Sequence, residues 1–407
     1  MKIAGIIAEY NPFHNGHAHQ IELLHAAGFD GIVCVCAPSM VQRGTQSIFP
    51  TAVRTQAALA GGVDLVLSLP APFATRSAEG FADAGVQLLA ALGICDVLAF
   101  GTETCNQRLL DDTVLALQSA AFAPKLQNEL AKGLPFATAR AAAADALCPG
   151  SGALLRSPNN ILAVEYCKAL SRLACAGKPA PKPLALPRKG NAHDAPLLCE
   201  TQNFASASAL RTLIFTKNKD IVSWQNAVPA ACMEIYCAAA QAGRLLRPSS
   251  FDTAVLSRLR GMSLAALQKV RGGTEGLENR LFSAIQTTDT LEALYTALKT
   301  KRYAHARMRR LVLDAALGYT DALPQTPPYL HVLGATQKGI AMLAQAKTAA
   351  TLPVSHALTL LEQTGENARV IAKAHSDAED LAALCLQKPM PCGTAYTTKM
   401  IREEAEI

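Results

Sequence analysis

Ile3-Ala4-Gly5-Ile6-Ile7-Ala8, followed closely by His14-Asn15-Gly16-His17, is the stretch of this 407-residue chain that decides its fold. The apolar run is typical of a short buried strand. From about Asn15 the apolar residues recur with the three-to-four spacing of a helix that ends near Gly28. The four residues from His14 to His17, here called the histidine motif, therefore lie on a strand-to-helix turn.

The histidine motif has the chemistry of a phosphate site. A helix start exposes backbone N–H groups and the positive end of the helix dipole, and both attract phosphate. Gly16 lets the backbone approach a ligand closely. His14 and His17 project to one side of a first helical turn, where two imidazoles could hydrogen-bond the charge that builds up on an α-phosphate under attack. Histidines in such a turn can also simply cap the helix, so the motif alone leaves both roles open.

Length and composition favour a globular protein of two domains. Half of the residues are apolar and 17% are charged, which argues against disorder. The apolar runs are too short for a membrane span or a signal peptide, so we expect a cytoplasmic protein. The formal net charge of +6 permits a nucleic-acid partner without requiring one.

The twelve cysteines are scattered singly through apolar segments. The closest pair, Cys34 and Cys36, lacks the two-residue spacer of a zinc site. We therefore predict reduced core thiols and no structural metal.

Short apolar segments alternate with helical patterns in the first half of the chain. They cover residues 2–8, 31–36, 63–69, 96–100 and 183–187, the rhythm of a parallel α/β sheet with right-handed crossovers. From about Trp224 the strand signal fades and helical patterns take over. We predict a Rossmann-like α/β domain over residues 1–220, followed by a mostly α-helical domain over 221–407, in which residues 329–333 are a candidate strand.

Polar or glycine-containing segments follow three of the predicted strands. They are residues 9–17, 101–103 and 188–190. Because ligands of parallel α/β sheets bind at the carboxyl ends of the strands, we expect the three segments to line one pocket. The chain contains neither a Gly-x-x-x-x-Gly-Lys-Ser/Thr loop nor a Gly-x-Gly-x-x-Gly motif after a strand, which argues against the two commonest nucleotide-binding loops.

A second candidate phosphate site begins at Ser206. Ser206 or Ser208 is a plausible helix N-cap, which would be a purely structural role. Arg211 lies one turn further on, however, so that hydroxyls, backbone N–H groups and a guanidinium would face one spot. That combination would suit a departing pyrophosphate.

These two sites resemble the His-x-Gly-His and Ser-x-x-Arg-type signatures of the nucleotidyltransferase superfamily, which includes cofactor adenylyltransferases and, more remotely, class I aminoacyl-tRNA synthetases. A closer resemblance is to the bacterial tRNA(Met) cytidine acetate ligases. It is carried by Ile7-Ala8-Glu9-Tyr10-Asn11-Pro12-Phe13-His14-Asn15-Gly16-His17, Val41-Gln42-Arg43-Gly44, Phe100-Gly101-Thr102-Glu103, Ser157-Pro158-Asn159-Asn160-Ile161-Leu162 and Glu275-Gly276-Leu277-Glu278-Asn279-Arg280-Leu281. The resemblance covers most of the chain but has no landmark in its last quarter.

The resemblance implies a two-step reaction. ATP and acetate form acetyl-adenylate and pyrophosphate, and the acetyl group then passes to N4 of the wobble cytidine of elongator tRNA(Met). The products are N4-acetylcytidine and AMP. Mg²⁺ is expected as a companion of the ATP phosphates, although no residue pattern marks a protein site for it.

The resemblance also implies roles for individual residues. His14 and His17 would stabilise the α-phosphate in the transition state, while Arg211 would help to hold the other phosphates. The implied ATP contacts are Ile7, Ala8, Glu9, Tyr10, Asn11, Pro12, Phe13, His14, Asn15, Gly16, His17, Ala18, His19, Gln20, Gly101, Arg188, Ser206, Ser208 and one member of the Asn159-Asn160 pair, of which we favour Asn160.

The segment after the second predicted strand departs from the family pattern. Ala37-Pro38-Ser39-Met40 stands where the family usually has a glycine and an asparagine, and Thr45-Gln46 stands where an acidic residue is usual. The contacts that this loop makes with acetate or with the acceptor therefore stay open.

The densest basic run extends from Lys299 to Arg310. Such a run can be no more than a solvated helix face. As an RNA surface it would contact the phosphate backbone, and Tyr303 could stack on an unpaired base. We predict tRNA contacts at Lys301, Arg302, Tyr303, Arg307 and Arg310, with a possible extension through Arg258, Arg260, Lys269 and Arg271.

Two other functions compete with the acetate ligase. A small-molecule cofactor adenylyltransferase would need neither acetate nor RNA, but it would leave the large helical region without a purpose. A non-catalytic RNA-binding protein is disfavoured by the intact histidine motif and Arg211. The oligomeric state and the acetate pocket stay open at the level of sequence.

Overall fold

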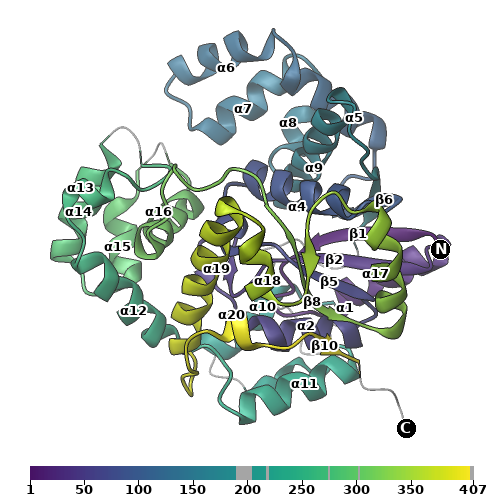
Figure 1. The fold of residues 1–407 in the computed structure, drawn as a ribbon. Helices are drawn as coiled ribbons and strands as arrows, with labels where there is room; N and C mark the ends of the chain where they lie inside the picture. Colours follow the sequence, from purple (N-terminus) through teal and green to yellow (C-terminus); the bar gives the residue numbers. More distant parts are fainter. Residues whose placement is uncertain (189–203, 217–219, 274–275, 301–302, 404–407) are drawn as a thin grey trace.

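In a computed structural model of the chain, the described residues are 1–188, 204–216, 220–273, 276–300 and 303–403 (Figure 1). They form an eight-stranded sheet with helices on both faces. Two groups of helices lie to the side of this sheet. One runs from α5 (Gln107–Gln118) to α8 (Ser151–Leu154) at the top of Figure 1, and the other from α12 (Pro248–Arg260) to α16 (His305–Leu317) at its left.

Five parallel strands form the centre of the sheet, in the spatial order β5-β2-β1-β6-β7. They are β1 (Ile3–Ala8), β2 (Gly31–Cys36), β5 (Leu65–Ser68), β6 (Val97–Thr102) and β7 (Lys182–Pro187). All four neighbouring pairs are parallel, as in β1 and β2, where Ile3 lies opposite Gly31. The order reverses between β1 and β6, and in doubly wound sheets such a point opens the ligand crevice.

The predicted strands are confirmed, and the alternation of their side chains explains the two faces of the sheet. Ile3 and Ile7 of β1 pack into one apolar core, whereas Ala4 and Ile6 pack into the other. Successive side chains of a strand point to opposite faces, so a strand covered on both sides must be apolar throughout.

Helices cover each face of the sheet. The core that contains Ala4 receives α1 (Asn15–Ala26), α2 (Thr51–Ala60), α10 (Ala207–Phe215), η1 (Ile221–Trp224) and α11 (Ala230–Gln241). The core that contains Ile3 receives α4 (Ala78–Leu92), α9 (Pro158–Cys175), α17 (Gln337–Ala349) and α19 (Glu366–Leu384). The predicted helix from Asn15 is confirmed, with His14 as its N-cap.

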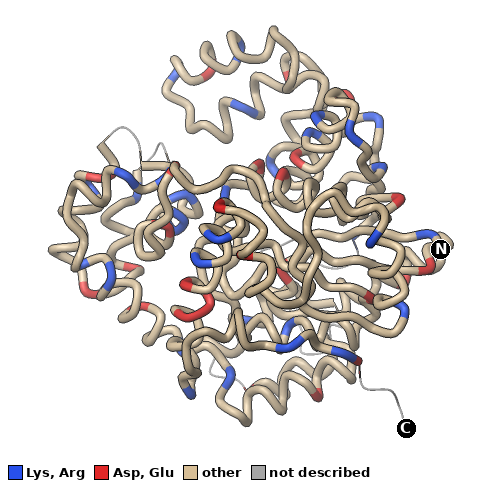
Figure 2. Tube along the Cα trace, in the orientation of Figure 1, with Lys and Arg blue, Asp and Glu red and all other residues tan. Residues whose placement is uncertain are grey.

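The two lateral groups have different sizes and cores. The upper group contains α5 (Gln107–Gln118), α6 (Phe122–Ala131), α7 (Phe136–Asp145) and α8 (Ser151–Leu154), and it extends the core beside α9. The left group, here called the helical lobe, contains α12 (Pro248–Arg260), α13 (Leu264–Leu267), α14 (Leu277–Thr287), α15 (Leu291–Leu298) and α16 (His305–Leu317). It has its own core, which also receives part of α19. Basic and acidic segments are interspersed along the helical lobe in Figure 2.

The C-terminal residues return to the sheet, so the region from residue 221 onward, predicted as mostly α-helical, also contributes strands to the N-terminal sheet. Strand β8 (Leu330–Ala335) pairs antiparallel with β5, and β9 (Val354–Ser355) and β10 (Ile401–Arg402) pair with β8. The apolar run at 329–333 is therefore a strand, as predicted, but it extends the N-terminal sheet. A division into domains at residue 220 stays a prediction.

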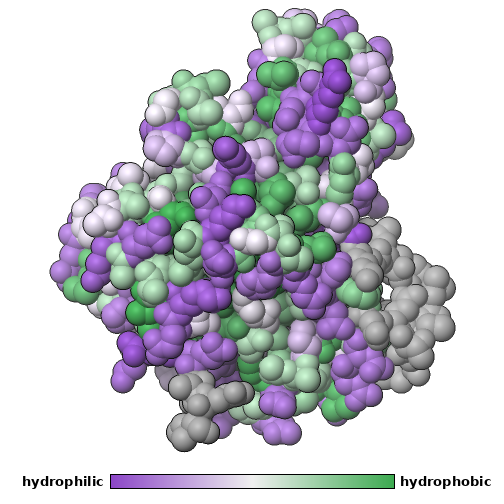
Figure 3. Space-filling model, turned by 90° about the vertical axis from the view of Figure 1, so that its right-hand side faces the viewer, coloured by the Kyte–Doolittle hydropathy of each residue, from purple (hydrophilic) through white to green (hydrophobic). Residues whose placement is uncertain are grey.

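Short elements complete the described chain. They are the hairpin β3 (Met40–Val41) and β4 (Thr45–Gln46), α3 (Ala71–Ala74), α18 (Leu358–Leu361), η2 (Glu362–Thr364) and α20 (Thr394–Thr397). The described cysteines are free thiols, with Cys34 and Cys36 buried in β2. Within the described ranges, no helix is both long and apolar enough to cross a membrane. Hydrophilic and hydrophobic side chains are mixed on the face drawn in Figure 3.

Candidate functional site

A cavity of about 620 Å³ opens at the carboxyl ends of β1, β6 and β7. The histidine motif, the end of β6 and Arg188 after β7 all contribute to its wall, as the sequence predicts for a single pocket. Residues 189 and 190 lie outside the described residues. Of the implied ATP contacts, the lining includes Ile7, Ala8, Glu9, Tyr10, Asn11, His14, Gly16, His17, His19, Gln20, Gly101, Arg188, Ser206 and Ser208.

The two histidines of the motif cap helix α1 and also face the cavity. The Gly16 N–H donates to Nδ1 of His14 at 3.0 Å, and the His14 N–H donates to Nδ1 of His17 at 3.2 Å. The rings stack with their centroids 3.9 Å apart. Because each Nδ1 accepts a hydrogen bond, the proton of each neutral ring must be on Nε2. The capping role therefore prepares both imidazoles to act as donors through Nε2–H.

Electrostatics keep these imidazoles neutral. Burial, followed by the charges of Arg188 and Arg211, lowers the pKa of His14 to about 3. Burial also lowers the pKa of His17 well below its usual range, and His14 and Arg188 add to the effect. Both rings are therefore neutral at pH 7, and they can donate hydrogen bonds to an anion without carrying a charge of their own.

Aromatic residues behind the motif hold the histidines in place. The Tyr10 ring meets the rings of Phe13 and His17 edge to face, at centroid distances of 4.9 and 4.8 Å. The Phe13 N–H donates to the hydroxyl of Tyr236 in α11 at 2.9 Å. Phe13 is completely buried, so this part of the motif is better explained by support of the histidines than by contact with a ligand.

Five implied ATP contacts are not among the residues that line the cavity: Pro12, Phe13, Asn15, Ala18 and Asn160. Asn15 instead donates through its side chain to the Asn226 carbonyl. Consecutive residues of the motif cannot all contact one ligand, because successive side chains point in different directions where a turn leads into a helix.

The asparagine pair is arranged differently from our preference for Asn160. Asn159 lines the cavity, and its side-chain amide donates to Glu103. Asn160 is buried, and its Oδ1 accepts hydrogen bonds from the Thr102 hydroxyl and from the Glu103 N–H. The geometry favours Asn159 for direct ligand contact, with Asn160 shaping the end of β6.

Arg211 and the serines before it face the motif across the cavity. Ser206 caps α10, since its Oγ accepts from the Ala209 N–H at 3.2 Å, so the structural role foreseen for it is present. Arg211 projects from α10 one turn after its N-cap and donates to the Asn11 carbonyl. Burial lowers the pKa of Arg211, which Glu9 partly offsets, but a guanidinium stays protonated. One cation is thus anchored directly beside the histidine motif.

A further wall of the cavity comes from elements that lie far apart in the sequence. Gln42 and Arg43 of the β3-β4 hairpin and His305, Arg309 and Arg310 of α16 all line it. The sequence marked the hairpin and the basic run separately, but no local pattern indicates that they meet. Arg310, predicted as a tRNA contact, thus lies on the cavity, whereas His305 and Arg309 were missed as site residues.

The rest of the predicted RNA surface is divided. Lys301 and Arg302 lie outside the described residues. The Arg307 guanidinium lies over the Tyr303 ring, 4.4 Å from its centroid. Arg271 does not extend this surface, which corrects the prediction. Arg271 is buried and paired with Asp314 at 2.8 Å, where it holds the helical lobe together.

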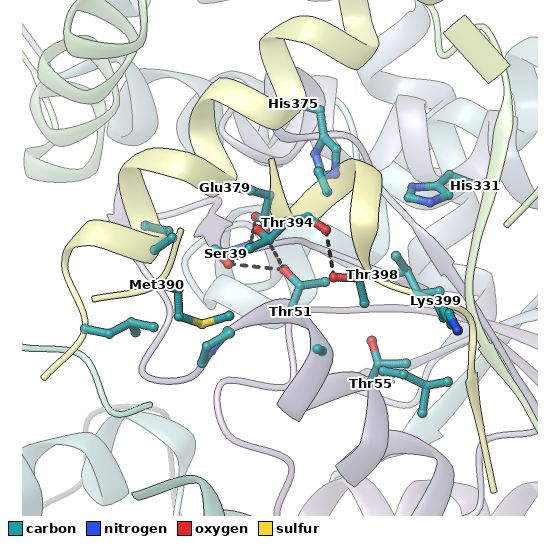
Figure 4. Close-up of a pocket in the computed structure, with 18 of the residues that line it drawn as sticks. Ser39, Thr51, Thr55, His331, His375, Glu379, Met390, Thr394, Thr398 and Lys399 are labelled. Atoms are coloured by element: carbon teal, nitrogen blue, oxygen red, sulfur yellow. Dashed lines mark hydrogen bonds between the residues drawn. The ribbon is translucent and has the colours of Figure 1, made fainter. Parts of the chain in front are cut away.

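A second, smaller cavity of about 70 Å³ lies between α2, β8 and α19 (Figure 4). Glu379 accepts hydrogen bonds from the Ser39 N–H, the Ser39 hydroxyl and the Thr51 hydroxyl, which ties α19 to the segment after β2. Burial lowers the pKa of His331 to about 3 and that of His375 to about 4. A space of this size has room for a few ordered waters beside its polar groups, and we interpret it as a structural junction.

Comparison with known proteins gives relatives over nearly the whole chain. Residues 1–391 match the model of the family described as HIGH Nucleotidyl Transferase. A tRNA(Met) cytidine acetate ligase of Acetivibrio thermocellus is 32% identical over 98% of this chain and 100% of that protein. One of Clostridium kluyveri is 34% identical over 87% of this chain and 89% of that protein.

Solved structures agree with these relatives. The crystal structure of Thermotoga maritima TmcAL bound with α-thio ATP has a TM-score of 0.88 and 25% identity, covering 99% of this chain and 100% of that one. The apo form of the same protein has a TM-score of 0.90 and 26% identity over the same shares.

Proposed function

The chain belongs to the HIGH nucleotidyl transferase family and to the tRNA(Met) cytidine acetate ligases. We therefore propose that it acetylates N4 of the wobble cytidine of elongator tRNA(Met). It would use ATP to activate acetate. The observation that carries the proposal is the cavity in which two neutral histidine donors and two arginines, Arg188 and Arg211, surround one space.

The first step joins acetate to the α-phosphate of ATP. An acetate oxygen attacks the α-phosphorus, and the bond to the bridging oxygen breaks as pyrophosphate leaves with the electron pair. Nε2–H of His14 and His17 would hydrogen-bond the oxygens on which charge increases. Donors placed before the reaction begins stabilise such charge without reorganisation. Neutral donors suit this step because their burial beside two arginines would make a charged imidazole costly.

Arginine and serine side chains would hold the remaining phosphates. Arg211 would neutralise the departing pyrophosphate, assisted by Ser206 and Ser208 at the start of α10. Gly101, Asn159 and Arg188, at the ends of β6, α9 and β7, would hold the nucleoside part of ATP. The α-thio ATP bound in the Thermotoga maritima structure supports a nucleotide site in this fold.

Mg²⁺ would accompany ATP on its phosphate oxygens and water. In the part of the chain that the structure describes, no three His, Cys, Asp or Glu side chains gather into a metal site. Glu9, the single acidic side chain on the described cavity wall, accepts a hydrogen bond from the Gln42 N–H at 2.8 Å. A metal here would therefore depend mainly on oxygens of the nucleotide.

In the second step, N4 of cytidine attacks the acetyl carbonyl carbon. The C–N bond forms, the C–O bond to AMP breaks with its electron pair on AMP, and the amine loses a proton to solvent. We assign tRNA contact to the helical lobe, through Tyr303, Arg307 and Arg310 together with Lys301 and Arg302. Such an enzyme would act in the cytoplasm, where its tRNA is found.

Incubation with ATP, labelled acetate and either elongator or initiator tRNA(Met) tests the proposal. We expect acetate-dependent pyrophosphate exchange and label in the elongator tRNA alone. Turnover of ATP that needs neither acetate nor tRNA would instead indicate a cofactor adenylyltransferase. Binding of tRNA with no turnover would indicate a non-catalytic RNA-binding protein.

A further inference from the structure

One wall of the large cavity has no part in the ATP assignment. It consists of Gln42 and Arg43 from the β3-β4 hairpin and of His305, Arg309 and Arg310 from α16, and we call it the α16 wall. The helix belongs to the helical lobe, whereas the hairpin follows β2 of the sheet. The α16 wall is thus where the helical lobe meets the nucleotide cavity.

The α16 wall is a close-packed junction. Gly44 has φ of 74°, and a Cβ there would lie 2.5 Å from the backbone nitrogen of Arg310, so glycine is required by both conformation and space. The Arg310 guanidinium donates to the Gln42 carbonyl at 3.4 Å. The Gln42 N–H in turn donates to Glu9, which precedes the histidine motif. Contacts therefore run without a break from the motif to α16.

Charge on the described cavity lining is strongly unbalanced. Five arginines, Arg43, Arg188, Arg211, Arg309 and Arg310, face one carboxylate, Glu9. Arg188 and Arg211 suffice for the ATP contacts proposed above. The other three all lie on the α16 wall, so this wall carries positive charge beyond that assigned to the nucleotide.

Arg309 adds an observation that points to a ligand. Its Nε is buried and has no hydrogen-bond partner. The guanidinium is held in place by the Tyr295 ring, 5.3 Å from its centroid, and by the exposed Glu292, 3.7 Å away. About a third of the Arg309 side chain is exposed, and it lines the cavity. A buried N–H without an acceptor is costly, so an anion that binds this guanidinium and shifts it slightly would supply the acceptor that Nε lacks.

We propose that the α16 wall is the acceptor subsite, which binds the phosphates that flank the unpaired nucleotide to be acetylated. The proposal rests on the function proposed above. Single-stranded RNA fits the wall because it brings phosphates for Arg43, Arg309 and Arg310 together with a splayed base that can enter the cavity. Tyr303 and Arg307 lie just before these residues on the chain, so bound RNA would continue along the helical lobe.

The two half-reactions separate this subsite from the ATP site. Pyrophosphate exchange needs ATP and acetate but no RNA, whereas acetyl transfer needs all three. For Arg309→Gln we expect exchange within about twofold of the wild type. The KM for elongator tRNA should rise about tenfold, with kcat changed less than threefold, and the salt dependence of tRNA binding should lose about one unit of slope.

Two further variants serve as controls for this test. Arg309→Lys keeps the charge, so its KM for tRNA should lie between those of the wild type and Arg309→Gln. Arg247→Gln is the matched control, because Arg247 is an exposed arginine at the N-cap of α12 that donates to the Gln387 carbonyl and lies outside the predicted tRNA contacts. It should leave the KM for tRNA within about twofold.

Each opposing outcome has a distinct meaning. A parallel loss of exchange and transfer in a folded Arg309→Gln protein would assign the α16 wall to ATP and overturn the proposal. An unchanged KM and an unchanged salt slope would also overturn it. If the wild-type protein catalyses exchange but acetylates no RNA, the function proposed above fails, whatever the variants do.

Discussion

Arginines lie in two kinds of region in this molecule, and the contrast distinguishes framework from site. Arg54 in α2 is completely buried and donates to the backbone carbonyls of Phe49, Glu9, Ala37 and Pro38. In the large cavity, Arg211 donates one hydrogen bond to the Asn11 carbonyl and lines the open space. Arg309 also lines the cavity, and its buried Nε has no hydrogen-bond partner. An arginine whose donors are satisfied by the protein holds the fold, and one whose donors face a cavity is available to an anion.

The largest effect should follow from loss of a framework arginine. We expect Arg54→Met to lower the free energy of unfolding by about 3 to 5 kcal/mol, because several buried carbonyls would lose their donor at once. Urea denaturation followed by circular dichroism measures this. Arg247→Met, at an exposed arginine of the helical lobe, is the control and should change stability by no more than about 0.5 kcal/mol. Equal losses of unfolding free energy in the two variants would contradict the assignment of Arg54 to the framework of the fold.

Substitution in the histidine motif should impair chemistry rather than folding. We expect His17→Ala to lower acetate-dependent pyrophosphate exchange by about 10² to 10³-fold, as for loss of one donor to a transition-state anion. Its unfolding midpoint should change far less than that of Arg54→Met, since His17 accepts one capping hydrogen bond whereas Arg54 donates to four backbone carbonyls. An exchange rate equal to that of the wild type would refute the role assigned to His17.

Replacement of a cavity arginine should have an intermediate effect. We expect Arg211→Met to lower exchange by about 10- to 100-fold, the cost of one charge-assisted contact of about 1.5 to 3 kcal/mol, with little loss of stability. Steady-state exchange and urea denaturation on the same preparation measure both quantities. A loss of stability as large as that of Arg54→Met would place Arg211 with the framework instead.

At pH 7 the smallest effect is expected from the two buried histidines of the second cavity, and it grows as the pH falls. His331 and His375 have folded pKa values of about 3 and about 4, against about 6.5 when unfolded, so between these values the unfolded chain binds more protons. Stability should therefore fall as pH decreases below about 6.5. For each histidine the slope is at most about 1.4 kcal/mol per pH unit. His331→Gln should flatten the slope in urea titrations from pH 7.5 to 4.5, and a slope identical to that of the wild type would contradict the prediction.

Local patterns predicted most of the sheet and the start of the site. Apolar runs of four to six residues marked β1, β2, β5, β6 and β7, because a strand covered on both faces must be apolar. The return of β8 to this sheet was beyond prediction. The apolar run of β8 could pair with any exposed strand edge. Its partner in the structure is β5, which lies more than 260 residues away in the chain and pairs with it antiparallel.

Site residues divide in the same way. His14, His17 and Arg211 could be selected because spacing within one turn decides where such side chains point. The preference for Asn160 over Asn159 stays a prediction that spacing could not support. Neighbouring helical residues differ in direction by about 100°, and only the packing of α9 sets which of the two faces the cavity. His305 and Arg309 gave no local signal beyond the charge of their run.

The sequence by itself determined a strand-turn-helix phosphate site, an α/β sheet around it and, through resemblance, an enzyme family. Those features depend on short-range periodicity and on residues a few positions apart, which the covalent chain holds together. Tertiary structure alone decided which arginines are framework and which face the cavity. That distinction depends on partners from distant segments, as when Arg271 meets Asp314 while Arg309 and Arg310 reach the hairpin after β2. The sequence shows which residues are charged. Only the packing of distant elements decides which of them find hydrogen-bond or ion-pair partners within the protein.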